Sequence, residues 1–277
     1  SEMCIRDSIM AGGSLGALFG SEISKRFSDS FNEFGIELFG LSASFFLFLA
    51  MMLAVYMLSI YRKDTSIDLN NVGGGSFDAI KNSLQNNEIR NISTYVWIWT
   101  ALMTIQWITA INIVEDWSQD SEQRLRFFAT IEQVISPLTL VVQLFLTNII
   151  IKRFGIKNIM LSYGLIFCLA YMLYGLAPSI VSVGVVTVLL RVFEYGVNKP
   201  TRETIFSTFQ KNDRYKSTVF IDTFVSRFGD LSGSGFIALS KLTGLATNAF
   251  PLMAIPIAGY LSFLGIKISK DVKTRDL

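Results

Sequence analysis

Seven long apolar stretches, separated by shorter polar segments, dominate this sequence. Each contains roughly 18–26 residues, which lets a helix cross a hydrocarbon core about 30 Å thick at about 1.5 Å per residue. None shows the sustained polar–apolar alternation that is typical of an outer-membrane strand. We therefore expect seven full transmembrane helices, over residues 36–61, 94–113, 128–151, 159–176, 180–197, 219–242 and 249–266.

The composition argues against a soluble domain and against most kinds of catalytic site. Only 17% of the residues are charged, against about 25% in soluble domains. The sequence has no His and two Cys, which excludes His-dependent triads, His metal ligands and a four-cysteine zinc site. It also lacks the GxxxxGK[ST], HExxH and GxSxG motifs, so we expect no ATPase motor, no enzyme, no cofactor and no metal.

The N-terminal part of the sequence suggests how the chain is organised. Residues 1–8 (SEMCIRDS) resemble a translated adapter sequence and are expected not to be native. The apolar stretch that follows ends at residue 20 and is too short to span a membrane, so we expect a half-helix of an N-terminally truncated chain. The expected organisation is the end of an N-terminal half-bundle at 9–61, a cytoplasmic linker at 62–91 and a six-helix C-terminal half-bundle at 92–277.

Lys and Arg are distributed unevenly between alternate loops. The loops that are rich in these residues hold 16 of them and are 62–91, 152–158, 199–216 and 267–277. The alternate loops hold four and are 21–35, 115–126, 177–179 and 243–248. Because cytoplasmic loops carry the excess of Lys and Arg, we expect the first set and the C-terminus to be cytoplasmic.

A polar stripe follows one face of the expected helix 128–151. Its residues are Glu132, Ser136, Thr139, Gln143 and Thr147. Their spacing of three and four places them within roughly 80° on a helix. Because an ionisable residue near the centre of a span costs at least about 2.5–3.5 kcal/mol, the stripe favours a helix that lines a hydrated pathway. Hydrogen bonding between packed helices is the alternative.

The expected helix 94–113 carries Thr100, Thr104 and Trp107 on one face. An aromatic ring at this level would stack on a solute or else face lipid, and both interpretations stay open. Near the end of the same span, Trp97 and Trp99 are expected to act as interfacial anchors.

Ionisable residues also occur in two of the last three spans. Arg191 and Glu194 are three residues apart, so they either pair with each other or form a gate or a site for an anionic group. Asp222, Arg227 and Asp230 lie in the span 219–242 beside several Gly and Ser residues, which allow backbones to approach. Buried charges within half-bundles joined by a cytoplasmic linker are typical of secondary transporters.

Residues 191–233 resemble the bacterial ATP/ADP translocase-like transporters, a nucleotide antiporter family allied to the major facilitator superfamily. The matching residues are Pro200, Arg202, Glu203, Tyr215, Lys216, Ile221, Asp222, Arg227, Gly229 and Asp230. The resemblance implies a twelve-helix carrier that works by alternating access between two six-helix halves and exchanges nucleotides. Asp230 matches this broader pattern but differs from the nucleotide translocases proper, which carry Lys at this position.

We therefore expect a multi-pass secondary transporter of the bacterial inner membrane, whose partners are lipid and an anionic solute of nucleotide type, without nucleic acid. The expected substrate or gating residues are Arg191, Glu194, Arg202, Lys216, Asp222, Arg227 and Asp230. A proton-coupled carrier of a neutral or cationic solute and a non-transporting scaffold are the alternatives. A clearly positive pathway favours the anion carrier, a balanced or negative one favours the proton-coupled carrier, and a scaffold needs no cavity.

Overall fold

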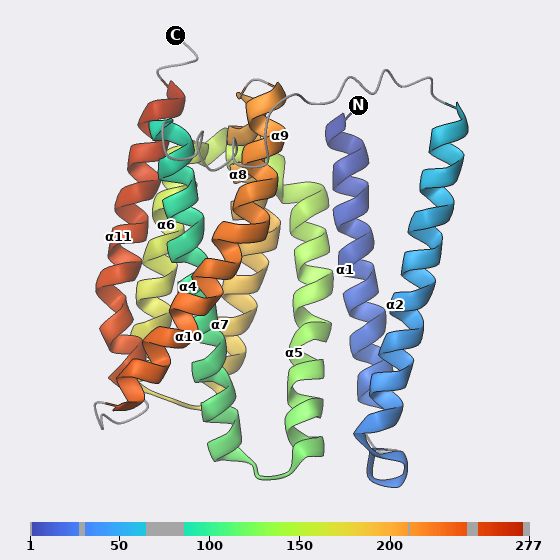
Figure 1. The fold of residues 1–277 in the computed structure, drawn as a ribbon. Helices are drawn as coiled ribbons and strands as arrows, with labels where there is room; N and C mark the ends of the chain where they lie inside the picture. The colour runs from blue at the N-terminus through green and yellow to red at the C-terminus, as the bar shows by residue number, and fades with distance from the viewer. Residues whose placement is uncertain (1, 28–30, 65–85, 210, 243–248, 274–277) are drawn as a thin grey trace.

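The structure, a computed structural model, describes residues 2–27, 31–64, 86–209, 211–242 and 249–273, and every regular element in them is a helix (Figure 1). The α-helices are α1 (Glu2–Phe27), α2 (Phe31–Asp64), α4 (Asn87–Trp117), α5 (Ser121–Val141), α6 (Thr147–Leu176), α7 (Ile180–Phe193), α8 (Lys199–Ser207), α9 (Lys211–Phe220), α10 (Ser226–Leu242) and α11 (Ala249–Lys273). Three π-helical turns join some of them, η1 (Val142–Leu146), η2 (Glu194–Asn198) and η3 (Ile221–Val225). The expected all-α fold is confirmed for the described residues.

Within the described residues, five helical segments are long and apolar enough to cross a membrane. They are Gly40–Ile60, Asn87–Trp117, Ser121–Leu176, Ile180–Ser207 and Ala249–Lys270. These segments confirm the expected multi-pass membrane protein. Their number differs from the seven expected spans, for two physical reasons.

The first reason is that Ser121–Leu176 contains two of the expected spans. The segment has 56 residues, about twice as many as one crossing needs. The chain turns within it at Gly155, whose φ of 71° lies in the left-handed region. Glycine adopts this conformation without the steric cost that a Cβ would bring. Two expected spans, 128–151 and 159–176, therefore lie on either side of one glycine turn.

The second reason concerns the expected span 219–242, which is not among the five. It is divided between the end of α9, η3 and α10, and it carries three of the charges singled out from the sequence. The expected half-helix before residue 21 lies within α1, which is also not among the five.

The boundaries of the expected linker differ from the prediction at both ends. The α2 helix continues to Asp64, and α4 begins at Asn87 instead of residue 92. Asn86 caps the start of α4, because its side-chain oxygen accepts a 2.9 Å hydrogen bond from the amide of Glu88. The expected linker residues 65–85 lie outside the described residues.

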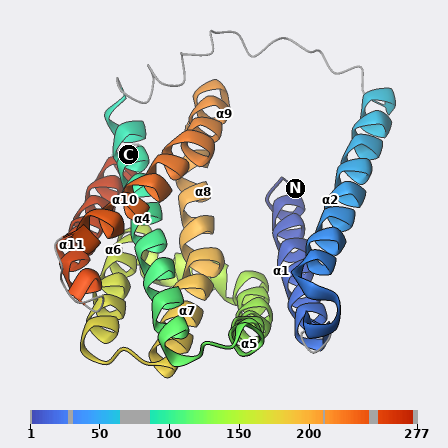
Figure 2. The same ribbon diagram turned by 60° about the horizontal axis from the view of Figure 1, so that its bottom comes forward.

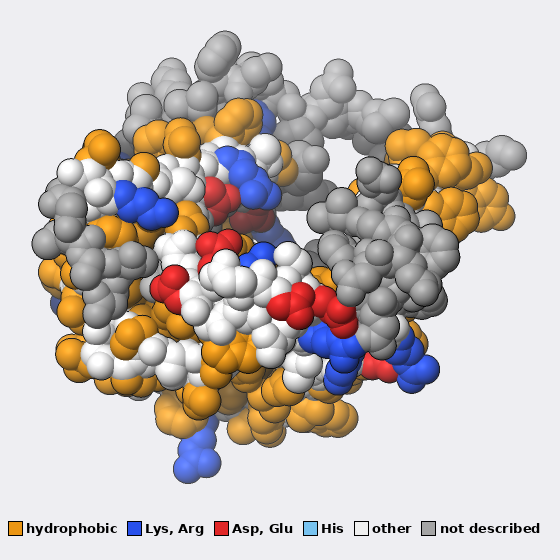
Figure 3. Space-filling view, turned by 90° about the horizontal axis from the view of Figure 1, so that it is seen from below, with side chains coloured by type: hydrophobic (Ala, Val, Ile, Leu, Met, Phe, Trp, Pro, Cys, Tyr) orange, Lys and Arg blue, Asp and Glu red, His pale blue; other side chains and the backbone are white. Residues whose placement is uncertain are grey.

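Helices α4 to α11 form one bundle, and α1 lies to one side of it, next to α5, with α2 beyond α1 (Figures 1 and 2). Within the bundle, α6 packs along α11 and α4 packs along α10, while α1 packs along α5. The largest buried side chains of the core are aromatic, among them Tyr95, Tyr163, Phe167 and Tyr171. Seen from below, charged side chains lie near the middle of the molecule, and hydrophobic side chains form much of its outline (Figure 3).

Two glycines four residues apart bring α10 close to α4. A Cβ on Gly229 would lie 2.6 Å from the carbonyl oxygen of Trp97, and a Cβ on Gly233 would lie 2.5 Å from that of Ala101. Trp97 adds a 3.0 Å hydrogen bond from its indole nitrogen to Ser232. Small residues at this spacing are the usual way for membrane helices to pack backbone against backbone.

Substituting either glycine by alanine tests this close packing. We expect Gly229→Ala and Gly233→Ala to lower the thermal unfolding temperature of the purified chain in detergent, because overpacking costs about 1–3 kcal/mol. Gly235→Ala is the matched control, because nothing lies within 4 Å of a Cβ there. Equal unfolding temperatures for all three variants would contradict the observed helix contact.

Candidate functional site

A polar pocket of about 430 Å³ lies between α1, α5 and the continuous helix formed by α7, η2 and α8. Its lining residues are Gly13, Ser14, Ala17, Glu132, Ile135, Ser136, Thr139, Gln143, Arg191, Tyr195 and Lys199. The volume falls within the usual range of small-molecule sites, about 300–1,000 Å³. The structure thus brings four of the five residues of the polar stripe together with Arg191 in one cavity.

The pocket carries more positive than negative charge. A guanidinium nitrogen of Arg191 lies 3.4 Å from a carboxylate oxygen of Glu132, and the same guanidinium lies 5.4 Å from the centre of the Tyr195 ring. Lys199 has no ion-pair partner among the described residues. Two cations therefore face one acid, which leaves a positive charge available to a ligand.

Two buried polar atoms of this pocket lack hydrogen-bond partners among the described residues. They are Oγ1 of Thr139 and Nε of Arg191. Thr139 is only 3% exposed, so bulk water does not hydrogen-bond to its hydroxyl group. Because buried polar groups are nearly always hydrogen-bonded, each of these two atoms has unused hydrogen-bonding capacity beside the pocket.

The contact between α1 and α5 is polar at several points beside the pocket. Ser14 donates a 3.3 Å hydrogen bond to Gln143, Lys25 donates a 3.0 Å hydrogen bond to Gln133, and Gln133 also contacts Glu22. A hydrogen bond from Arg26 lowers the pKa of Glu22, so this carboxylate stays ionised at neutral pH. The helix α1 is therefore held to α5 partly by exposed polar contacts.

Two π-helical turns face each other on the bundle side of the pocket. The side chain of Gln143 donates a 3.1 Å hydrogen bond to the carbonyl oxygen of Tyr195, and Thr147 donates one of 2.6 Å to that of Gly196. A Cβ on Gly196 would lie 2.6 Å from Val142. Thr147 thus serves packing between helices, the alternative considered for the stripe. Nothing in the sequence signalled these turns, which often occur at functional sites.

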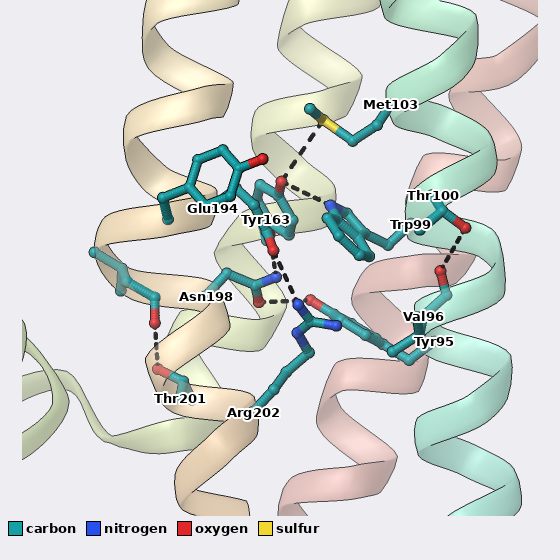
Figure 4. A network of polar contacts seen from close by, with 12 residues as sticks. Tyr95, Val96, Trp99, Thr100, Met103, Tyr163, Glu194, Asn198, Thr201 and Arg202 are labelled. Carbon is teal, nitrogen blue, oxygen red and sulfur yellow. Dashed lines mark hydrogen bonds and ion pairs between the residues drawn. The ribbon is translucent and has the colours of Figure 1, made fainter. Parts of the chain in front are cut away.

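A second polar cluster lies on the other side of η2, where Glu194, Asn198 and Arg202 follow at intervals of four residues (Figure 4). Arg202 donates a 3.0 Å hydrogen bond to one carboxylate oxygen of Glu194, and Asn198 donates one of 2.6 Å to the other. Tyr95 of α4 then donates to Asn198 at 3.1 Å. Glu194 is 2% exposed and Arg202 6%, so this is a buried ion pair.

Aromatic side chains enclose the cation of this cluster. The guanidinium of Arg202 lies 4.5 Å from the centre of the Trp99 ring. The indole nitrogen of Trp99 donates a 2.8 Å hydrogen bond to the hydroxyl group of Tyr163. Trp99 is therefore part of the helix bundle, and the prediction of an interfacial anchor at this position is wrong.

The ion pairs also differ from one sequence interpretation, the pairing of Arg191 with Glu194. Arg191 lies near Glu132 of α5, whereas Glu194 binds Arg202. The reason is that Arg191 lies on the face toward α5, whereas Glu194 lies on the face whose partners come from α4 and α6. Sequence spacing alone shows which residues are able to meet, but not which neighbouring helix each one faces.

The remaining candidates lie on other helix faces. Thr104 donates a 3.0 Å hydrogen bond to Asp230, which also pairs with Arg227 at 3.0 Å. Arg227 is 80% exposed, and Asp222 is exposed as well. Thr100 packs against Gly229, so the two threonines serve the contact between α4 and α10.

Trp107 and Lys216 also lie away from the pocket. Trp107 packs on Phe128 of α5, with ring centres 5.3 Å apart. Lys216 is partly exposed on α9. Neither residue lines the pocket described above, nor do Thr100, Thr104, Asp222, Arg227 or Asp230.

No family model and no curated protein matches this chain.

Removing one member of the buried ion pair tests the second cluster. We expect Arg202→Met to destabilise the purified chain by about 3–5 kcal/mol, because it leaves the carboxylate of Glu194 buried without its cation. The double variant Arg202→Met/Glu194→Leu should recover much of this loss, since no uncompensated charge stays behind. The measurement is unfolding in detergent. A double variant less stable than Arg202→Met would contradict this account.

Proposed function

We propose that this chain is part of a secondary active transporter that moves an anionic solute of nucleotide type across the bacterial inner membrane by alternating access. Under this proposal it supplies seven full transmembrane helices and part of an eighth, including a six-helix C-terminal half with a cytoplasmic C-terminus. The proposal also takes up the resemblance of residues 191–233 to ATP/ADP translocase-like carriers of the major facilitator type.

The charge of the polar pocket carries this proposal. Arg191 and Lys199 outweigh Glu132 among the lining residues, and both cationic side chains are hydrogen-bond donors. A phosphate group has several acceptor oxygens and negative charge, so it would accept hydrogen bonds from these side chains and compensate their excess positive charge. The long 3.4 Å contact between Arg191 and Glu132 leaves the guanidinium able to exchange its carboxylate partner for a solute oxygen.

The position of the pocket also supports alternating access. One wall comes from α1, which belongs to the expected N-terminal half, and the other walls come from α5 and the α7–η2–α8 helix. Solutes of such carriers bind at the interface between the two repeats. Gly13, Ser14 and Ala17 supply the α1 wall, and their small side chains leave room for a solute.

The two alternatives fit these observations less well. A scaffold needs no cavity, yet a polar pocket is present between the helices. A proton-coupled carrier of a neutral or cationic solute fits a balanced or negative pathway, yet the charge here is positive.

Transport by cells that express the full-length protein tests the proposal. We expect uptake of labelled ATP or ADP, and we expect Arg191→Ala to lower the uptake rate about 10- to 100-fold, because a hydrogen bond to a charged group contributes about 1.5–3 kcal/mol. Lys241→Ala is the control, since Lys241 is exposed on α10 and does not line the pocket. Protein levels in the membrane are compared for all variants.

Two results would count against the proposal. If the expressed wild-type protein moves neither ATP nor ADP, the nucleotide assignment fails. If Arg191→Ala transports at the wild-type rate, the pocket is not the solute site, whatever the solute is.

A further inference from the structure

An apolar groove runs along the outer surface of the bundle between α5, α6 and α7. Its volume is about 840 Å³. Leu138, Val185 and Leu189 are among the lining residues and are exposed, so the groove is open to the surroundings of the helices. It lies apart from the polar pocket, with which it shares no lining residue.

The two ends of the groove differ in chemistry. Asn158 and Ser162 are its only polar lining side chains, and both belong to the first turns of α6 after Gly155. The hydroxyl group of Ser162 donates to its own helix at Ile159. The amide of Asn158 is exposed and has no hydrogen-bond partner in the part of the chain that the structure describes.

Three basic residues lie beside this polar end. Lys152, Arg153 and Lys157 are exposed and adjoin the lining residues Phe154 and Asn158 in the sequence. None of the three has an ion-pair partner among the described residues. The turn at Gly155 therefore presents a group of uncompensated cations at one end of the groove.

The other end of the groove is open at Gly184. No heavy atom lies within 4 Å of a Cβ built at this residue. Residues 177–179 join α6 to α7, so the two helices are antiparallel and Gly184 is level with about residue 172 of α6. That position is about 14 residues from Asn158, or about 20 Å along the helix. One leaflet of a hydrocarbon core about 30 Å thick is shorter than this. The groove is therefore long enough for the acyl chain of a lipid.

We propose that this groove is a specific binding site for an anionic phospholipid. An acyl chain lies against the apolar walls as far as Gly184, and the phosphate group accepts hydrogen bonds from Asn158 and from Arg153 and Lys157. Basic sites between transmembrane helices are a general means of binding anionic headgroups. This site does not depend on the proposed transport function.

Charge argues against the main alternative occupant, a second copy of the chain. A two-fold symmetric contact uses the same patch on both copies. Two copies that have the same orientation in the membrane and meet through this groove would bring the basic ends of both grooves into one interface. An anionic lipid instead compensates the cations and fills the apolar space at once.

Lipid binding to the purified, delipidated chain in detergent tests this inference. Bound lipid is counted by native mass spectrometry during titration with phosphatidylglycerol or phosphatidylcholine. We expect phosphatidylglycerol to bind about 25-fold more tightly than phosphatidylcholine, since Arg153 and Lys157 each contribute about fivefold near an anionic headgroup. Gly184→Leu fills the groove and should lower this affinity about tenfold.

Two comparisons make the test specific. Gly259→Leu is the matched control for Gly184→Leu, because nothing lies within 4 Å of a Cβ at Gly259 and it does not line the groove. The double variant Arg153→Gln/Lys157→Gln should remove the preference for phosphatidylglycerol. Because these two side chains are exposed, their substitution should leave the fold intact. This variant therefore tests headgroup binding even if Gly184→Leu does not fold.

Three results would overturn the inference. Equal affinity for phosphatidylcholine excludes headgroup recognition, and unchanged binding by a folded Gly184→Leu excludes the groove. Displacement of phosphatidylglycerol by inorganic phosphate alone would show a simple anion site that has no need of the apolar walls.

Discussion

The buried ion pair between Glu194 and Arg202 is the interaction on which the arrangement of the other polar groups depends. Two ionised side chains removed from water need each other and further hydrogen bonds to offset their lost hydration. Asn198 supplies one such bond to the carboxylate, and Tyr95 ties Asn198 to α4. Through Tyr95, and through the Trp99 ring on Arg202, the cluster turns this face of the α7–η2–α8 helix toward α4.

That rotation places the basic wall of the pocket. Arg191, Tyr195 and Lys199 recur at intervals of four, like the residues of the buried cluster, but they lie on the face toward α5 and α1. With Glu194 turned toward α4 and α6, Arg191 meets Glu132 instead. The π-helical turns η1 and η2 hold this register, because Gln143 and Thr147 bind the carbonyl oxygens of Tyr195 and Gly196. The positive pocket and the buried cluster thus lie on two different faces of the α7–η2–α8 helix.

Much of the fold could be predicted from the sequence, because long apolar helices leave a strong periodic signal. The stripe from Glu132 to Gln143 was predicted from its spacing, and the structure brings it to a pocket, although its role in transport stays a prediction. The sequence does not show which neighbouring helix each helix face contacts. Trp99 was expected at the lipid interface but covers Arg202, since its indole finds Tyr163 across the bundle. Lys199 was not predicted as a site residue, because in the sequence it is one of several basic residues in the loop 199–216.

The contacts of the described helices differ in a way that bears on movement. α6 meets α11 through close backbone packing, where a Cβ on Gly265 would lie 2.8 Å from the backbone of Met160, and through buried apolar side chains such as Phe167 and Leu261. Separating such surfaces loses close van der Waals packing. α1 meets α5 and η1 through polar contacts that are exposed or partly buried, and beside a pocket. A solute or water can replace such contacts. If the protein alternates between two states as proposed, the boundary between α1 and α5 is where the helices separate, and the C-terminal bundle moves as a unit.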